Sequence, residues 1–307
     1  MISDKKALEV VAYAEKNGDS ECLKMFPSLS MESLNRYRRK SNEILNPKKF
    51  PNILLFDIET LRMEGRFWHL GKQRINPDQV DKDWSIACWA AKWLGSSKTI
   101  GESVTPEEAI ERQDKSILKG MWDLIDKADI IVAHNGERFD IRKLNWRWRQ
   151  AGLMPPSPYL IVDTLKHSRR IFDISSHRLD YINKQRGLTT KMPTDISLWR
   201  RCEDGELAAL KYMFKYCKVD IACLEDQYLD IRPWIKGHPN CGLFISGQDP
   251  VCPNCASTNL GYTTTDYYTP AGCFTGIRCK DCGGVGREMS NKFNKDSRKR
   301  LIRSIAR

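Results

Sequence analysis

The sequence has no long apolar run and no apolar amino-terminal segment. No stretch approaches the roughly 18 consecutive apolar residues that a membrane-spanning helix needs. The first residues, MISDKKALEVVAYAEKNGD, are charged throughout, which argues against a signal peptide. We therefore expect a cytoplasmic protein without a membrane partner. With 41% hydrophobic and 29% charged residues, a collagen, a coiled-coil rod or a disordered tail is excluded as the main description.

Basic residues outnumber acidic ones, 50 Lys and Arg against 39 Asp and Glu, for a net charge of +11. A basic surface attracts polyanions, of which nucleic acid is the commonest, although general solubility also explains such a charge. The 307 residues suffice for about two domains.

The 11 cysteines are odd in number, and a disulfide framework is not expected in a cytoplasmic protein. Six of them lie within residues 241–282, which indicates a metal site.

Residues 1–45 are expected to form a small helical module. Residues 5–17 have the apolar spacing of a helix, a shorter helical stretch reaches Phe26, and Ser30 can cap a third helix over 31–40. The polar segment 41–51, with its two prolines, has the composition of a linker.

Three short helices that end in a basic one resemble a helix-turn-helix. In that interpretation Arg36, Arg38 and Arg39 lie near DNA. The alternative is a helical appendage with a solvated basic face.

Residues 50–235 alternate between strand-like and helix-like patterns, which predicts an α/β domain. Strands are expected at 52–58, 84–94, 98–104, 129–135 and 158–163, the second and third as antiparallel neighbours of the first. Helices are expected at 106–128, with proline in the first turn, at 137–152, and through most of 164–230.

Two carboxylates end the first apolar strand. Asp57 and Glu59 in FDIET are spaced by two, so both side chains leave the same face of a strand. Burying two carboxylates at the end of a strand costs free energy unless a cation compensates their negative charge. Ligand sets made of oxygen atoms favour Mg²⁺ or Mn²⁺. An exposed acidic pair at a strand-to-loop junction is the alternative.

Two later segments hold further candidate residues for the same acidic site. Asp140 in HNGERFD follows the 129–135 strand, at the edge of the same sheet. Tyr216 and Asp220 in YCKVD are spaced by four on a helix, so they share one helical face.

Taken together, FDIET, HNGERFD and YCKVD resemble the three exonuclease motifs of the DEDD superfamily, over about residues 50–235. The tyrosine four residues before the last aspartate resembles the DEDDy, DnaQ-like branch that includes polymerase proofreading domains. The stretch TDISLWRRCEDGELAALKYMFKYCKVD also resembles stand-alone members, many of them phage-encoded, which would place the protein in a bacterial or phage-infected cell.

The resemblance implies a ribonuclease H-like mixed sheet flanked by helices and 3′→5′ removal of nucleotides. The helix-turn-helix pattern favours DNA over RNA as the substrate. It implies that two Mg²⁺ or Mn²⁺ ions about 3.5–4 Å apart are held by the four acids and that Tyr216 orients the attacking water. The residues it assigns to the site are Asp57, Glu59, Asp140, Tyr216 and Asp220. Asn135, at the end of the 129–135 strand, either lines the substrate end of the site or has a structural role there. An exoribonuclease, a structure-specific endonuclease and a non-catalytic regulator on a nuclease fold are the alternatives.

The carboxy-terminal cysteines predict a zinc ribbon over residues 240–290. Cys252 and Cys255 form one CxxC knuckle, Cys279 and Cys282 form the other, and four thiolates complete a closed tetrahedral zinc site. Residues 291–307 are expected to be a basic tail, either helical or disordered.

Overall fold

The computed structural model describes residues 3–45, 50–69, 71–247, 249–302 and 305. These residues form two compact units, one of residues 1–51 with 241–250 and the other of residues 52–240 with 251–307. Among the described residues, no helix is both long enough and apolar enough to cross a bilayer.

The first unit is a three-helix module of α1 (Asp4–Asn17), α2 (Asp19–Met25) and α3 (Met31–Leu45), followed much later in the chain by the short 3₁₀ helix η3 (Cys241–Phe244). Gly18 joins α1 to α2 at a φ of 85°, which a residue with a Cβ adopts only under strain. The buried side chains that hold the helices together are Ala7, Val10, Val11, Ala14, Cys22, Leu34 and Tyr37. The third helix continues to Leu45, so the prediction of a linker from residue 41 was wrong at that end.

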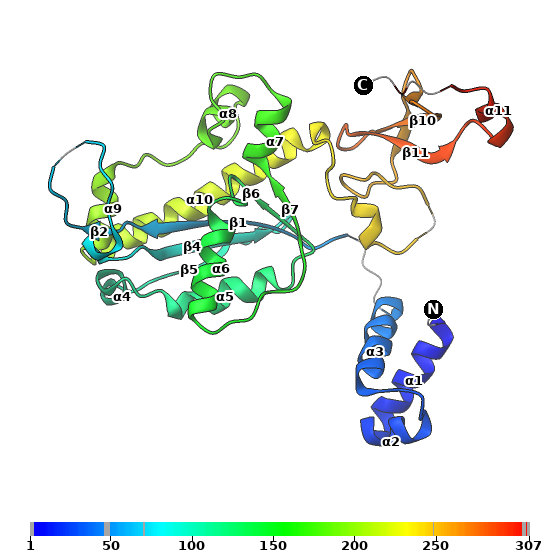
Figure 1. The fold of residues 1–307 in the computed structure, drawn as a ribbon, viewed down its shortest axis with the longest axis horizontal. Coiled ribbons are helices and arrows are strands. Elements are labelled where there is room, and N and C mark those ends of the chain that lie inside the picture. Colours follow the sequence, from blue (N-terminus) through cyan, green and yellow to red (C-terminus); the bar gives the residue numbers. More distant parts are fainter. Residues whose placement is uncertain (1–2, 46–49, 70, 248, 303–304, 306–307) are drawn as a thin grey trace. The chain divides into compact units, whose positions relative to one another are not determined.

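A five-stranded mixed sheet forms the centre of the second unit (Figure 1). Its strands are β1 (Ile53–Leu61), β4 (Ser85–Trp93), β5 (Ile100–Ser103), β6 (Ile130–Ala133) and β7 (Leu160–Asp163), in the order β5-β4-β1-β6-β7. β1 pairs in antiparallel fashion with β4 and in parallel fashion with β6. This confirms the α/β fold class with a mixed sheet.

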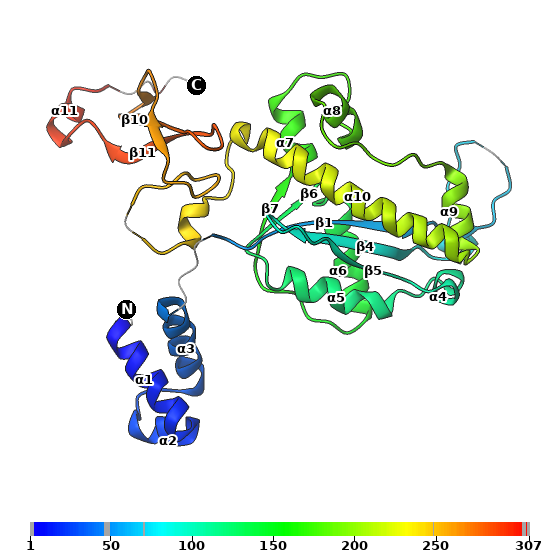
Figure 2. The same ribbon diagram turned by 180° about the vertical axis from the view of Figure 1, so that it is seen from behind.

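Helices cover both faces of this sheet. The longest, α10 (Leu207–Ile231), lies against β1 and β4 on one face, and α5 (Lys115–Ile125) and α6 (Asp140–Gln150) lie on the other (Figures 1 and 2). Three shorter helices, α7 (Thr164–Ile171), α8 (Leu179–Arg186) and α9 (Ile196–Glu203), connect β7 to α10.

The single helix expected over 106–128 is two helices, α4 (Pro106–Glu111) and α5. Arg112 ends α4 in the left-handed conformation, at a φ of 56°, and its buried guanidinium forms an ion pair with Glu64. Asp114 is also buried, where it accepts hydrogen bonds from the Ile86 amide and from Arg147. These tertiary contacts are stronger than the local helical preference, and they break the helix.

An insertion between β1 and β4 forms a small hairpin that the sequence patterns did not predict. It consists of β2 (Glu64–Gly65) and β3 (Val80–Lys82), with the 3₁₀ helix η1 (Pro77–Gln79) before β3.

The carboxy-terminal segment forms a second, smaller sheet after the 3₁₀ helix η2 (Arg232–Trp234). Its strands are β8 (Leu260–Tyr262), β9 (Tyr267–Thr269), β10 (Gly272–Cys279) and β11 (Val285–Asn291), and β10 pairs with the other three. Within the basic tail, α11 (Lys295–Lys299) is a helix of little more than one turn.

Candidate active site

The first two predicted acids lie where β1 extends past its parallel neighbour. Leu55 is level with Val132 near the end of β6, so Asp57 and Glu59 lie beyond the carboxyl end of that strand. Their spacing of two places both on one face of β1. Both are only partly exposed.

Asp220 joins these two acids from α10. Asp57, Glu59 and Asp220 each offer a carboxylate oxygen that lies within 4.8 Å of the other two. One oxygen of Asp220, Oδ1, is buried and finds no hydrogen-bond partner among the described residues. Three oxygen ligands with an unsatisfied carboxylate oxygen fit a hard divalent cation such as Mg²⁺ or Mn²⁺.

Asp140 lies beside this group but is not one of its three members. It is the first residue of α6, and its Oδ1 accepts a 3.2 Å hydrogen bond from the amide of Ile58, the residue between Asp57 and Glu59. Among the neighbouring charges, that of Asp140 raises the pKa of Asp57 the most. The structure thus brings all four predicted acids to one place, three of them within reach of a single ion.

Burial raises the pKa of every acid in this group. The pKa of Asp57 is well above its usual value because of burial and the charges of Asp140 and Glu59. Burial, with repulsion from Asp220, raises the pKa of Glu59 to about 8, and burial raises the pKa of Asp140 to about 7. The pKa of Asp220 is raised by burial despite its ion pair with Lys191. Acids in such surroundings ionise together only when cations neutralise them.

Tyr216 and Lys191 complete the site. The ammonium of Lys191 forms an ion pair with Asp220 and donates a 3.2 Å hydrogen bond to the Tyr216 hydroxyl. Burial, with the charge of Asp220, raises the pKa of Tyr216, so the phenol keeps its proton at neutral pH. Lys191 was missed by the sequence reasoning, because one lysine in a loop has no distinctive signal in a chain with 50 basic residues.

Comparison with known proteins identifies the family of the domain that carries this site. The family model of the RNase H superfamily matches residues 54–228, which is more than half of the chain. This chain belongs to the RNase H superfamily. Membership supports nuclease activity in general, the binding of nucleic acid, and the use of divalent metal ions.

A search of solved structures finds the family B DNA polymerase from the hyperthermophilic archaeon Pyrobaculum calidifontis, at 17% identity and a TM-score of 0.45. The similarity covers 60% of this chain and 25% of the polymerase chain, so the chain spans only a quarter of that protein's length. No curated protein matches this chain.

In the RNase H domain, the loop after β6 is held by Asp163, at the end of β7. This buried carboxylate accepts hydrogen bonds from the amides of Asn135 and Glu137 as well as from Lys166, the third residue of α7. Asn135 adopts a left-handed φ of 72°, and a Cβ on Gly136 would lie 2.4 Å from that of Ala133. The predicted substrate-end residue Asn135 therefore lies on a constrained loop that leads directly to Asp140.

The predicted DNA-contacting arginines lie on α3 of the first unit. Arg38 donates a 3.0 Å hydrogen bond to Asp19 Oδ2 and forms an ion pair with the same carboxylate, so it stabilises the helical module. Arg36 is mostly exposed and lies 3.8 Å from Glu32. The side chain of Arg39 lies outside the described part of the structure.

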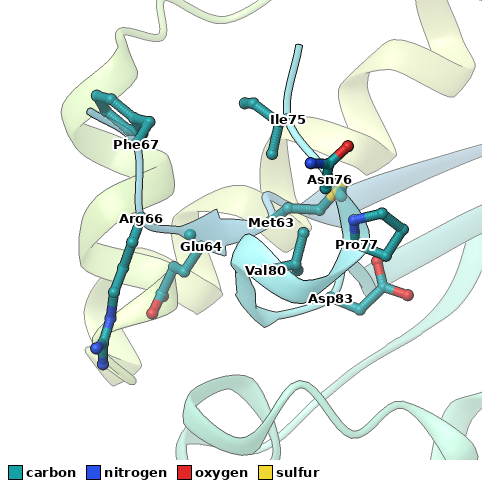
Figure 3. A pocket seen from close by; sticks show the side chains of 10 residues that line it. Met63, Glu64, Arg66, Phe67, Ile75, Asn76, Pro77, Val80 and Asp83 are labelled. Atoms are coloured by element: carbon teal, nitrogen blue, oxygen red, sulfur yellow. The ribbon is translucent and has the colours of Figure 1, made fainter. Parts of the chain in front are cut away.

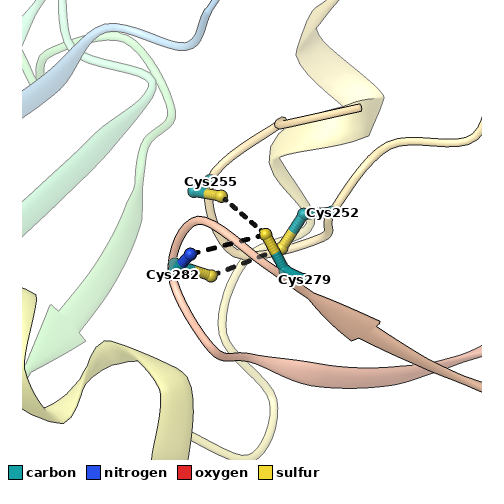
Figure 4. A group of neighbouring side chains, drawn as sticks. All are labelled: Cys252, Cys255, Cys279 and Cys282. Carbon is teal, nitrogen blue, oxygen red and sulfur yellow. Dashed lines mark hydrogen bonds between the residues drawn. The ribbon is translucent and has the colours of Figure 1, made fainter. Parts of the chain in front are cut away.

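The four predicted zinc cysteines come together beside the small carboxy-terminal sheet, where Cys279 ends β10 (Figure 4). Cys252, Cys255, Cys279 and Cys282 each offer a sulfur atom within 4.8 Å of the other three. Sulfur atoms lie 3.6 Å apart in the pairs Cys252–Cys282 and Cys255–Cys279. This donor set fits a tetrahedral Zn²⁺ site.

Proposed function

We propose that this protein is a metal-dependent 3′→5′ exonuclease that hydrolyses DNA with two Mg²⁺ or Mn²⁺ ions. One observation carries the proposal: Asp57, Glu59 and Asp220 converge from β1 and α10 with carboxylate oxygens within 4.8 Å, on an RNase H superfamily domain. Asp140, against the backbone of β1, supplies a fourth acid beside them.

The acids would hold the ions. Asp57, Glu59 and Asp220 form the first ligand set, and Asp140 extends it on the α6 side. Divalent ions at such a site activate water and stabilise the negative charge of a departing 3′ oxygen.

Tyr216 would orient the attacking water. Its raised pKa keeps the hydroxyl protonated, so it is a poor general base and a good hydrogen-bonding group. Lys191 fixes its position through the 3.2 Å hydrogen bond and brings a positive charge to a site that must receive phosphate. Both side chains therefore act on the geometry and charge of the site.

The remaining parts of the chain support a nucleic-acid substrate. The chain has a net charge of +11, and α3 presents the exposed Arg36 on a module predicted to resemble a helix-turn-helix. The proposed preference for DNA over RNA rests on that module. Asn135 would lie near the substrate end of the site. The cysteine cluster would hold one structural Zn²⁺ ion.

The test is hydrolysis of 5′-labelled single-stranded DNA, duplex DNA and RNA in Mg²⁺, Mn²⁺ or EDTA. The proposal predicts a ladder of shortened DNA products that requires metal and is abolished by a blocked 3′ end. Degradation of RNA in place of DNA would make the enzyme an exoribonuclease. Cleavage of a substrate whose 3′ end is blocked would make it an endonuclease. Binding of nucleic acid without any cleavage would make it a regulator.

Asp57→Asn and Asp220→Asn should abolish hydrolysis while the fold and nucleic-acid binding persist. The matched control is Asp230→Asn on the same helix as Asp220, where the carboxylate forms an ion pair with Arg186 outside the acid group. Wild-type turnover in Asp57→Asn would contradict the assignment.

A further inference from the structure

The cavity beside the β2–β3 hairpin, of about 620 Å³, has no excess of positive charge around it (Figure 3). Its lining is largely apolar and includes Met63 and Val80. Arg66, also in the lining, pairs with Asp81, and Asp83 is a further acid there. The charge of this cavity therefore does not favour a polyanion. A cavity of the small carboxy-terminal sheet differs in this respect.

This smaller cavity, of about 340 Å³, lies between the loop after β8 and the middle of β10. Its lining includes Thr263, Tyr267, Gly276 and Arg278. A Cβ on Gly276 would overlap the Thr263 hydroxyl oxygen, so glycine allows the loop to approach the strand at this point. The volume lies at the lower end of the range of about 300–1,000 Å³ that is typical of ligand pockets. The cavity thus suits a small planar group such as a nucleobase.

Aromatic rings and arginines share one face of the sheet around this cavity. Alternation along β10 places Phe274, Gly276 and Arg278 on that face. Tyr267 on β9 is level with Phe274 and shares the face. Arg287 on β11 is level with Gly276 and shares it as well. The Arg287 guanidinium lies 3.8 Å from the centre of the Phe274 ring and 5.7 Å from that of Tyr267, which holds its charge beside both rings.

The two arginines of this face keep their positive charge available. Both Arg278 and Arg287 are exposed, and within the described part of the chain neither forms an ion pair with a carboxylate. The acid that lines the cavity, Asp266, forms an ion pair of 2.6 Å with Lys292. The face therefore presents two guanidinium groups to an anionic ligand.

The other acids of the segment leave it basic. Asp281 accepts hydrogen bonds from Ser257 and Asn259, and Glu288 in β11 is exposed. Over residues 251–302, eight basic residues outnumber four acidic ones. A polyanion is thus attracted to the segment as a whole as well as to the two arginines.

We propose that this face of the small carboxy-terminal sheet is a second nucleic-acid-binding site, which holds an unpaired DNA strand. Tyr267 is 51% exposed, so one base of the strand can stack on its ring at the cavity. Arg278 and Arg287 contact the phosphates on either side of that base. The inference goes beyond the proposed function, because it assigns binding of nucleic acid to a segment whose proposed part is to hold structural zinc.

The first test measures binding to the full-length Asp57→Asn protein, which leaves the strand intact. Fluorescence anisotropy with a labelled oligothymidylate compares Tyr267→Ala with this parent. We expect the affinity to fall about tenfold, the effect of losing one stacked base. The matched control is Tyr268→Ala: Tyr268 is 69% exposed, but it is level with Cys273 and so lies on the opposite face. Unchanged affinity in Tyr267→Ala, or equal losses in both variants, would overturn the inference.

The second test leaves Tyr267 in place and removes the two charges. In Arg278→Gln/Arg287→Gln, the slope of the logarithm of affinity against the logarithm of salt concentration should decrease by about 1.4, since each phosphate contact to a single strand contributes about 0.7. The zinc content of each variant, by elemental analysis, checks that the sheet is folded. An unchanged slope would show that these arginines do not contact phosphates and would overturn the inference.

A third measurement locates the strand directly. Oligothymidylate that carries 4-thiothymidine is irradiated with the Asp57→Asn protein, and the crosslinked peptides are identified by mass spectrometry. We expect crosslinks within residues 260–290, and crosslinks confined to residues 53–231 would contradict the inference. None of these measurements requires hydrolysis. Failure of the wild-type protein to cleave any substrate would therefore refute the proposed function alone, whereas the binding and crosslinking results decide the inference.

Discussion

Lys191 forms an ion pair with Asp220 inside the acid group of the RNase H domain. The pKa of the lysine is raised: burial opposes its charge, but Asp220 and Asp57 outweigh burial. The ammonium therefore occupies space and neutralises charge at the place where a divalent ion would bind.

Lys191→Met should strengthen metal binding and slow hydrolysis. Removing a competing cation leaves the acids more negative, so we expect Mn²⁺ affinity to rise about tenfold, equivalent to about 1.4 kcal/mol. Turnover should fall because Tyr216 loses its hydrogen-bond donor. A Mn²⁺ titration followed by electron paramagnetic resonance, with steady-state kinetics, checks both effects. Lys184→Met, whose ammonium pairs with Asp180 on α8, is the control, and weaker Mn²⁺ binding in Lys191→Met would contradict this account.

Tyr216→Phe should lower turnover without weakening metal binding. A hydroxyl that orients water contributes less than a full general base, so we expect a loss of roughly 10- to 100-fold, at or below the low end of the usual range for acid–base catalysis. Tyr212→Phe is the matched control on the same helix, since its hydroxyl donates to the Pro193 carbonyl. Unchanged turnover in Tyr216→Phe would show that the tyrosine contributes only packing and takes no part in hydrolysis.

Zinc removal should unfold the small carboxy-terminal sheet and spare the large one. The cysteine cluster is the predicted metal site of a segment too small to form an extensive core, so metal should contribute much of its stability. We expect about one zinc ion per chain by elemental analysis.

Chelation should increase hydrogen exchange over residues 251–291 and leave residues 53–231 protected. Cys279→Ser should reproduce this change, whereas Cys273→Ser, which is buried outside the four-cysteine group, should retain the zinc. A protein that purifies without zinc, or uniform exchange after chelation, would contradict the assignment.

His238 should make the protein sensitive to acid. Burial lowers its pKa to about 4, and its Nε2 lies 2.8 Å from the Tyr228 hydroxyl. Because an unfolded histidine titrates near 6.5, the folded state binds fewer protons below that pH. This contribution to stability is complete above about pH 6.5 and is lost as the pH falls toward about 4.

The lost stability is on the order of 1–3 kcal/mol. Urea unfolding at neutral and acidic pH measures it, and His238→Gln should show a smaller acid-induced loss than the parent. His69→Gln alters an exposed histidine and should unfold like the parent at each pH. An unchanged acid-induced loss in His238→Gln would show that its protonation is not linked to folding.

Local patterns were sufficient to predict the fold class and which acids share one face of an element, whereas the convergence of the acids was predicted from the resemblance to the DEDD exonuclease motifs. The run Asn52–Ile58 is apolar enough to be buried on both faces, and the spacing of Asp57 and Glu59 determines which face they share. The spacing of Tyr216 and Asp220 likewise places them on one stripe of α10. Two CxxC pairs place their own sulfur atoms close together, so the cysteine cluster was predictable as well.

The features that were missed depend on contacts between distant segments. The break at Arg112 follows from its ion pair with Glu64, 48 residues earlier in the chain. Lys191 reaches Asp220 across 29 residues, from a loop with no periodic pattern. No local preference encodes such pairs, because each residue alone is compatible with an ordinary solvated surface.

Anomalous diffraction from crystals soaked in Mn²⁺ tests the central claim most directly. The account predicts a strong peak coordinated by Asp57, Glu59 and Asp220, with the Lys191 ammonium displaced from Asp220. A fully occupied ion elsewhere, or acids that remain paired with Lys191 at saturating Mn²⁺, would contradict the claim that these residues form a catalytic metal site.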